Sequence, residues 1–318
     1  MSNAGVKIDK LNKDLGDFAI VDVSITVNDR DYFMVLGPTG AGKTILLETI
    51  AGIHRPDSGK LYINGGPVND VPPEKREVGF VYQDYALFPH LTVTENVLYG
   101  LRARGITDPE EKAEEVIDLL DLTPLKDRYP KTLSGGESQK TAVARAIAYE
   151  PNLLLLDEPT AALDPQTKEA VRGELRNVHD ELEITTLHVT HDQSEAKILG
   201  DRICVLMEGR VKQTGTVEEV FTAPIDEVTA NFVGVENVLD GEIKNAEENL
   251  AEIDVGEFTL YAVTDKTSGK VKAYIRPEDI FISEEPTSTT ARNNVKGKVV
   301  SVTHLGQVYR VTVDTGLS

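Results

Sequence analysis

The chain has 318 residues, 40% of them hydrophobic, and its 53 acidic residues against 33 Lys and Arg give a formal net charge of −20. This length allows two domains with hydrophobic cores. Nucleic acids and anionic lipid surfaces attract positively charged proteins, so the acidic composition excludes nucleic acid as an expected partner. The single cysteine, Cys204, excludes an internal disulfide and lies in an apolar run, which favours a buried thiol.

Residues 4–36 alternate apolar and polar side chains, which predicts an antiparallel β region. The region ends in an apolar strand over 32–36, and a helix is expected from residue 45. Between them lies the pattern G-x-x-x-x-G-K-[ST] of a phosphate-binding loop. Its backbone N–H groups, lysine and hydroxyl suit a nucleoside triphosphate and Mg²⁺. The expected binding residues are Gly37, Pro38, Thr39, Gly40, Ala41, Gly42, Lys43 and Thr44.

Further along the chain, short strands with turns are expected over 54–82 and helices over 92–150. Strands then alternate with helices, with strands near 153–156, 185–189 and 203–207. This alternation predicts an α/β fold with a mostly parallel sheet, and a helical subdomain at about 85–150. After residue 230 only short strands and turns follow. We therefore expect a first domain over 1–230 and a small, barrel-like all-β domain over 231–318.

The apolar strand over 153–156 ends in two acids, Asp157 and Glu158. At the carboxyl end of a strand beside a phosphate loop, Asp157 is suited to bind Mg²⁺. Glu158 is suited to orient the attacking water or to accept its proton. The alternative is a pair of solvated acids at a strand end.

A second group of small residues opens an Ala-rich helix: Leu133, Ser134, Gly135, Gly136 and Glu137. A serine and two glycines at a helix start form either a plain N-cap or a second anion-binding terminus. One phosphate loop is already present, so the second terminus has a use only if the nucleotide lies between two chains.

In combination, these motifs resemble those of the ABC ATPases, over about residues 6–230. The phosphate loop, the motif at 133–137 and the strand at 153–158 fall in the family's order. Gln83 matches the Q-loop, His191 the switch histidine, and Asp164 ends the D-loop. Two positions depart from the usual pattern, since Glu137 replaces a glutamine and Ala161 replaces a serine.

The resemblance implies a P-loop NTPase fold and a head-to-tail homodimer that binds ATP and Mg²⁺ between its chains. It implies that Glu158 is the general base and that His191 contacts the γ-phosphate. It implies that Gln83 contacts the metal or water, and that 133–137 close on the γ-phosphate of the opposing chain, with Asp164 at the interface. The family also stacks adenine on an aromatic ring. Phe18 is the nearest aromatic, and it either stacks on adenine or packs in the core.

Two further stretches resemble importer ATPases. The segment from Tyr82 to His90 is similar to the groove that receives a helix of a separate permease, although its aromatics would otherwise pack the base of the subdomain. The tail is similar to the regulatory β domain, named TOBE, of maltose, sulfate and molybdate importers. Candidate anion donors there, unless they are ordinary exposed polar residues, are Lys296, Lys298, Ser301 and Thr303.

The phosphate loop and the motif at 133–137 are most similar to those of archaeal molybdate/tungstate importers. The implied function is the ATP-hydrolysing subunit of such an importer, with two copies beneath two permease subunits and an extracytoplasmic substrate-binding protein supplying the oxyanion. The start of the chain carries no apolar signal core, and we expect the chain at the cytoplasmic face of the cell membrane. The alternatives are an importer of sulfate, sugar, polyamine or iron, a soluble ABC ATPase, and an anion sensor with a degenerate ATPase.

Overall fold

The computed structural model describes residues 4–284, 291–306 and 308–316. The chain divides into two compact units, Met1–Ile225 and Asp226–Ser318. The division lies slightly before the expected boundary at 230, because the short helix α8 (Glu227–Phe232) belongs to the second unit. The first unit alternates strands and helices and the second consists mainly of strands, as the sequence predicts.

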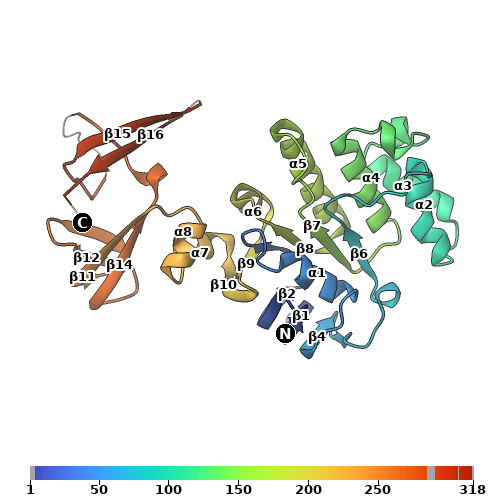
Figure 1. Ribbon diagram of the computed structural model, residues 1–318, viewed down its shortest axis with the longest axis horizontal. Helices are drawn as coiled ribbons and strands as arrows, with labels where there is room; N and C mark the ends of the chain where they lie inside the picture. The colour runs from blue at the N-terminus through green and yellow to red at the C-terminus, as the bar shows by residue number, and fades with distance from the viewer. Residues whose placement is uncertain (1–3, 285–290, 307, 317–318) are drawn as a thin grey trace. The chain divides into compact units, whose positions relative to one another are not determined.

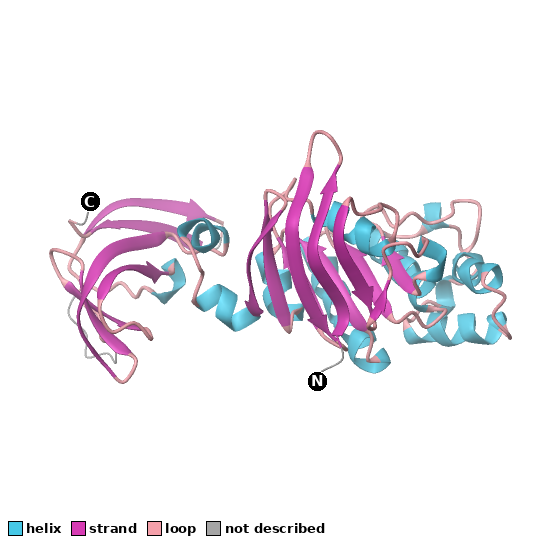
Figure 2. Cartoon of the chain, turned by 90° about the horizontal axis from the view of Figure 1, so that it is seen from below, coloured by secondary structure: helices cyan, strands magenta, loops and turns pink. Residues whose placement is uncertain are grey.

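The first unit contains two sheets (Figures 1 and 2). Its strands are β1 (Ala4–Asp14), β2 (Ala19–Asn28), β3 (Tyr32–Leu36), β4 (Ser58–Ile63), β5 (Gly66–Pro67), β6 (Val78–Val81), β7 (Leu153–Asp157), β8 (Thr185–Thr190), β9 (Arg202–Met207) and β10 (Arg210–Thr216). The smaller, antiparallel sheet has the order β2-β1-β4-β5 and the larger has the order β10-β9-β3-β8-β7-β6. In the larger sheet β9, β3, β8, β7 and β6 pair in parallel, and β10 is an antiparallel edge.

Helices cover the parallel sheet and form a separate lobe. They are α1 (Lys43–Ala51), α2 (Val93–Ala103), α3 (Pro109–Leu119), α4 (Gly135–Ile147), α5 (Pro165–Leu182), α6 (Gln193–Leu199) and α7 (Val217–Thr222). Strands β3, β7 and β8 are buried along their whole length. Strands covered on both faces usually have apolar residues at nearly every position. Strands β3 and β7 follow this pattern, whereas β8 also buries three threonines and His188.

Helix α1 lies between the two sheets (Figure 1). Its side chains Leu46, Leu47 and Ile50 are fully buried in a core that also contains residues of β1, β2, β3, β7, β8 and β9. The buried guanidinium of Arg76 donates to Thr49 O at 2.9 Å and to Ile50 O at 2.7 Å. These carbonyls belong to the last turn of α1, where a cation is stabilised by the helix dipole. The helix that follows the phosphate loop is therefore fixed along its side and at its end.

Helices α2, α3 and α4 form the lobe expected at 85–150 (Figure 1). The segment between β6 and α2 is held by Asn96, which is fully buried. Its amide donates to the carbonyls of Phe88, Leu91 and Thr92, and its oxygen accepts from Phe88 N at 2.9 Å. One buried side chain thus fixes the conformation of a loop that has little regular structure.

The short helices α7 and α8 were not expected from the sequence, because each has only six residues. The signal for α7 was nevertheless present as a capping box. The Thr216 hydroxyl accepts from Glu219 N at 3.1 Å, and the Glu219 carboxylate accepts from Thr216 N at 2.7 Å. A threonine followed three residues later by glutamate is the usual form of this motif.

The second unit contains a four-stranded antiparallel sheet with the order β13-β12-β11-β14 and a hairpin of two further strands. Its strands are β11 (Asn237–Glu247), β12 (Leu250–Asp254), β13 (Thr259–Val263), β14 (Gly269–Ile275), β15 (Lys298–Leu305) and β16 (Val308–Asp314). A small core around Ile243, Ile253 and Leu260 packs one face of the larger sheet. Among the described residues, backbone pairing does not join the hairpin to this sheet.

No helix in the described part of the chain combines the length and the apolar character that a membrane crossing needs.

Candidate functional site

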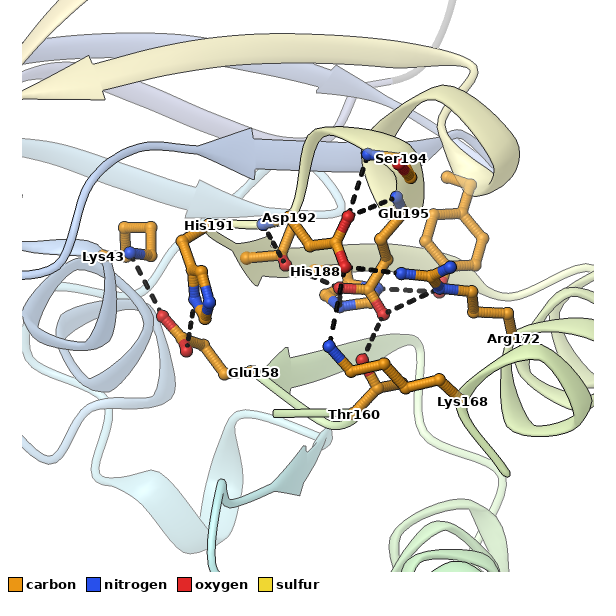
Figure 3. A network of polar contacts seen from close by, with 12 residues as sticks. Lys43, Glu158, Thr160, Lys168, Arg172, His188, His191, Asp192, Ser194 and Glu195 are labelled. Atoms are coloured by element: carbon orange, nitrogen blue, oxygen red, sulfur yellow. Dashed lines mark hydrogen bonds and ion pairs between the residues drawn. The ribbon is translucent and has the colours of Figure 1, made fainter. Parts of the chain in front are cut away.

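The phosphate-loop lysine lies at one end of a polar network at the carboxyl end of the parallel sheet, next to Glu158 (Figure 3). Lys43 is 5% exposed, and its Nζ donates to Gly37 O at 2.9 Å and to Pro38 O at 3.1 Å. It also forms an ion pair with Glu158 Oε1 at 3.1 Å. All three partners are strong acceptors, so the ammonium group is held in place by the loop that surrounds it.

The turn of the loop depends on Gly42, the N-cap of α1, whose φ of 97° lies in the left-handed region. A Cβ there would lie 2.7 Å from Phe18 Cε1, so this position also has no space for a side chain. The ring of Phe18 is half-buried and lies against the loop. Phe18 is thus next to the predicted phosphate site.

Thr44 and Asp157 bring two oxygen ligands together. The Thr44 hydroxyl donates to Asp157 Oδ1 at 3.0 Å. Burial raises the pKa of Asp157 to about 6, against the lowering effect of the Thr44 hydroxyl. Hydroxyl and carboxylate oxygens are the ligands that Mg²⁺ prefers, and one or two of them suffice where a phosphate supplies the rest. The residues therefore fit the predicted ion.

Glu158 and His191 form the second pair of the cluster (Figure 3). His191 Nδ1 lies 2.9 Å from Glu158 Oε2, while the other Glu158 oxygen faces Lys43. Glu158 has a φ of 43°, and its backbone N donates to Val189 O at 3.0 Å. A left-handed conformation is costly for a side chain other than glycine and persists where its surroundings impose it. The carboxylate is thereby turned from the strand toward both the loop and His191.

Gln83 lies in the turn after β6, at the same edge of the sheet as Asp157. Its side chain is exposed, and among the described residues it forms no hydrogen bond. Of the residues predicted for catalysis, Glu158 contacts Lys43 of the loop, and His191 contacts Glu158. Gln83 lies at the same sheet edge and forms no hydrogen bond with them.

The motif at 133–137 begins α4 and does not reach the loop of its own chain. The Ser134 hydroxyl accepts from Glu137 N at 3.3 Å, and the Glu137 carboxylate accepts from Ser134 N at 2.6 Å, which is a capping box. The hydrogen bond from Ser134 N lowers the pKa of Glu137. A Cβ on Gly135 would lie 2.9 Å from Leu163 Cδ2, so the glycine allows the segment before α5 to approach closely. In Figure 1, α4 lies in the helical lobe, apart from α1.

Asp164 is the N-cap of α5. Its Oδ1 accepts from Gln166 N and Thr167 N, both at 3.1 Å, and the Thr167 bonds lower the pKa of Asp164. The side chain of this predicted interface residue thus already has a local role, because it satisfies two of the free N–H groups at the helix start.

A buried polar cluster lies directly behind Glu158 and His191 and was not recognised in the sequence (Figure 3). Its centre is Glu195, 1% exposed, which accepts hydrogen bonds from the hydroxyls of Thr160 and Thr190. Arg172 and His188 also face it. A sequence signal existed, since Glu195 is four residues before the buried Leu199 and therefore shares the core-facing side of α6. A carboxylate at such a position requires buried partners.

The segment proposed as a permease groove is half-buried rather than fully exposed. Phe88 packs against Tyr99 with 4.4 Å between ring centroids, and Arg145 donates to the carbonyls of Tyr85 and Ala86. Tyr99 is 53% exposed. A groove of about 430 Å³ adjoins these rings, and its lining residues are Leu91, Glu95, Tyr99, Arg102 and Ala103. No motif in the sequence marks Tyr99.

The candidate anion donors of the second unit lie on or just before β15, and all four are exposed: Lys296, Lys298, Ser301 and Thr303. They are spread along one strand of the hairpin instead of gathering around a pocket. Their placement matches the alternative reading, in which they are ordinary exposed polar residues.

Comparisons with known proteins agree with this geometry. A family profile described as ABC transporter matches residues 20–161, and one described as TOBE domain matches residues 273–317. A molybdate/tungstate import ATP-binding protein of Pyrococcus abyssi is 45% identical, covering 98% of this chain and 89% of the relative. Its counterpart in Thermococcus kodakarensis is 42% identical, covering 95% and 90%. A sulfate/thiosulfate import ATP-binding protein of Shewanella oneidensis is 41% identical, covering 98% and 88%.

Two solved structures of ABC proteins are also similar to this chain. A dimeric ATP-binding cassette in a post-hydrolysis state, bound to ADP and Pi, matches with a TM-score of 0.60 and 31% identity, over 67% of this chain and 98% of that chain. The protein cbiO1 of Clostridium perfringens, part of an ABC transporter complex, matches with a TM-score of 0.64 and 26% identity, over 74% and 96%.

Proposed function

Because this chain belongs to the ABC transporter family of ATP-binding proteins, we propose that it is the ATP-hydrolysing subunit of an importer for a small oxyanion, molybdate or tungstate. The observation that carries the proposal is the cluster of Lys43, Glu158 and His191 beside the Thr44–Asp157 pair. The cluster contains a phosphate-binding cation, a candidate base with its orienting partner, and two metal ligands, all at one sheet edge. The names of the two archaeal relatives support the oxyanion.

The loop residues bind the phosphates of ATP. Lys43 exchanges its contact with Glu158 for the β- and γ-phosphates, and backbone N–H groups from Gly37 to Thr44 surround the same charge. Phe18, next to Gly42, stacks on the adenine. Thr44 and Asp157 would hold Mg²⁺, with Gln83 as a further ligand. A bound Mg²⁺ would supply positive charge against the phosphates.

Glu158 accepts the proton of the attacking water, and His191 holds its carboxylate through the 2.9 Å contact and reaches the γ-phosphate. Release of Glu158 by Lys43, when Lys43 binds phosphate, frees the Oε1 that takes the proton. Binding of ATP and activation of Glu158 as the base are therefore coupled through the Lys43–Glu158 ion pair.

The site is completed by a second copy of the chain. The segment from Leu133 to Glu137 presents a capped helix end on α4 that has no phosphate to bind in its own chain. In a head-to-tail homodimer it closes on the γ-phosphate held by the partner, with Asp164 at the interface. Closure on ATP and opening after hydrolysis then drive two permease subunits, which receive the oxyanion from a substrate-binding protein.

The permease docks on the helical lobe. The groove beside Tyr99, next to the loop that Arg145 holds, suits a short helix of the permease, since it offers aromatic surface with Glu95 and Arg102 at its rim. In this arrangement the ATPase lies at the cytoplasmic face of the cell membrane. The second unit is the regulatory domain of the subunit.

The second candidate is an importer of sulfate or thiosulfate, favoured by the 41% identity to the Shewanella oneidensis protein over nearly the whole chain. Vesicles that contain this chain with its permease and binding protein distinguish the two. We expect ATP-dependent uptake of labelled tungstate that excess molybdate abolishes and excess sulfate does not. Competition by sulfate alone would favour the second candidate, and uptake of neither anion would refute both.

A further inference from the structure

One buried carboxylate ties together the two segments that carry Glu158 and His191 (Figure 3). Glu195 Oε1 accepts from the Thr160 hydroxyl at 2.8 Å, and Oε2 accepts from the Thr190 hydroxyl at 2.5 Å. Thr160 follows Glu158 in the chain by two residues, and Thr190 directly precedes His191. Each oxygen of the carboxylate therefore binds a threonine that is close in sequence to Glu158 or to His191.

Thr190 is a junction of three segments. Its hydroxyl accepts from Asp192 N at 3.0 Å, which fixes the turn that carries His191. Its carbonyl accepts from Gly37 N at 3.2 Å, which attaches the first residue of the phosphate loop. The hydroxyl proton is directed to Glu195. Loss of that acceptor would loosen the His191 turn while leaving the backbone bond to Gly37 in place.

Thr160 holds the other segment. It lies in the turn after β7, where Ala161 N donates to Glu158 O at 3.1 Å and Leu163 N donates to Thr160 O at 3.2 Å. The Thr160 side chain is 1% exposed and connects this turn to α6. The direction of the Glu158 side chain thus depends on a turn that is anchored through Glu195.

The carboxylate of Glu195 faces the guanidinium of Arg172 and the imidazole of His188 inside the protein. Arg172 Nε lies 3.8 Å from Oε1 and His188 Nε2 lies 3.6 Å from Oε2, and neither nitrogen has a hydrogen-bond partner among the described residues. Arg172 also donates to Asp192 at 2.6 Å. A buried charge cluster of this kind contributes little to stability compared with apolar residues of the same volume, so its value is in fixing geometry.

We propose that Glu195 is a positioning residue for ATP hydrolysis, which holds the Thr160 and Thr190 segments in register so that Glu158 and His191 remain in contact. This inference rests on the proposed ATPase function. It does not extend to nucleotide binding, because the side-chain bonds of Lys43 and Thr44 go to Gly37, Pro38, Asp157 and Glu158, not to Glu195.

The test replaces Glu195 by Gln, which has almost the same shape. An amide has one acceptor oxygen where the carboxylate has two, so one of the two threonine hydroxyls loses its acceptor. We expect E195Q to lower kcat for ATP by about 10- to 100-fold, the scale of a misplaced reacting group, with KM close to that of the wild type. The matched control is E219Q, the same change at the same helical position of α7, and it should leave kcat unchanged.

Threonine variants separate loss of the hydrogen bond from general damage. T160V removes the hydroxyl and keeps the shape, whereas T160S keeps the hydroxyl. We expect T160V to lower kcat and T160S to retain it, and E195Q with T160V to lose less than the product of the two single effects. If E195Q does not fold, the kcat values of T160V and T160S test the same proposal, since only T160V removes the hydroxyl that binds Glu195.

A second readout does not depend on hydrolysis. Amide hydrogen exchange over residues 157–164 and 188–196 should be faster in E195Q and T160V than in the wild type and E219Q. Wild-type kcat in E195Q or T160V, or a fall in kcat matched by an equal loss of nucleotide affinity, would overturn the inference. A wild-type chain without ATPase activity would refute the proposed function. The exchange rates would then still test whether Glu195 holds the Thr160 and Thr190 segments in place.

Discussion

Replacement of Glu158 by Gln should affect nucleotide binding and hydrolysis in opposite directions. In the structure Glu158 has two partners, Lys43 at 3.1 Å and His191 at 2.9 Å. Hydrolysis should fall by about 100-fold or more, since a neutral amide cannot accept the proton of the attacking water. Binding should become tighter, because Lys43 must give up Glu158 to reach a phosphate.

The gain in affinity follows from the burial of the pair. The side chains of Lys43 and Glu158 are 5% and 14% exposed, so their contact is little screened by solvent. A hydrogen bond between charged groups contributes about 1 kcal/mol more than one to a neutral amide, which corresponds to about a fivefold change in affinity. ADP is the suitable ligand for the measurement, because it reports on the loop without closing a dimer on a γ-phosphate.

The assays are calorimetric titration with ADP and Mg²⁺, and phosphate release from ATP. The matched control is E150Q, which breaks the Lys112–Glu150 pair on the surface, where Glu150 is 73% exposed. E150Q should change neither quantity. Weaker ADP binding by E158Q would refute the competition between Glu158 and phosphate for Lys43. Hydrolysis within about threefold of the wild type would refute the role of Glu158 as the base.

Three further predictions concern stability and docking. Burial lowers the pKa of His188 in the folded state, while the unfolded chain takes up a proton below about pH 6.5. The stability from this residue is present above that pH and is lost as the pH falls. Between pH 7 and pH 5.5, the free energy of unfolding of H188Q should therefore fall by about 1 kcal/mol less than that of the wild type, as measured by urea unfolding. An identical pH dependence of the two proteins would contradict this. D164A should lower the melting temperature and D164N should not, because only alanine removes the cap of α5; equal melting temperatures would argue against the cap. Y99S should weaken co-purification with the permease and leave the basal ATPase unchanged, and undiminished co-purification would exclude the groove as the docking site.

The phosphate loop, the two acids at the end of β7 and the His191 turn could be predicted because each lies within a short stretch of sequence next to a buried strand. A loop between a strand and a helix is a local pattern, and its glycines and lysine have fixed positions within it. The same holds for the capping box at Ser134. The parallel strands β3, β7, β8 and β9 were expected close to their observed bounds, because short runs of apolar and β-branched residues mark them.

The Glu195 cluster as a whole could not be predicted, because its side chains come from the turn after β7, α5, β8 and α6. No spacing in the sequence brings Thr160 and Thr190 to the same carboxylate. The sequence also left Phe18 open, and only the approach of its ring to Gly42 places it at the loop. In the second unit, β11 and β12 are hard to recognise from the sequence, because acidic and amide residues interrupt their apolar pattern.

The central claim is that one site is built from two chains, and mixing two inactive variants tests it most directly. K43A removes the lysine of the loop and S134R blocks the helix end on α4, so each variant alone should lack ATPase activity. In an equimolar mixture half of the dimers are mixed, and each contains one site with both Lys43 and Ser134 intact. We expect the mixture to recover about a quarter of the wild-type activity. No recovery on mixing two folded variants, or full activity of either variant alone, would contradict the account.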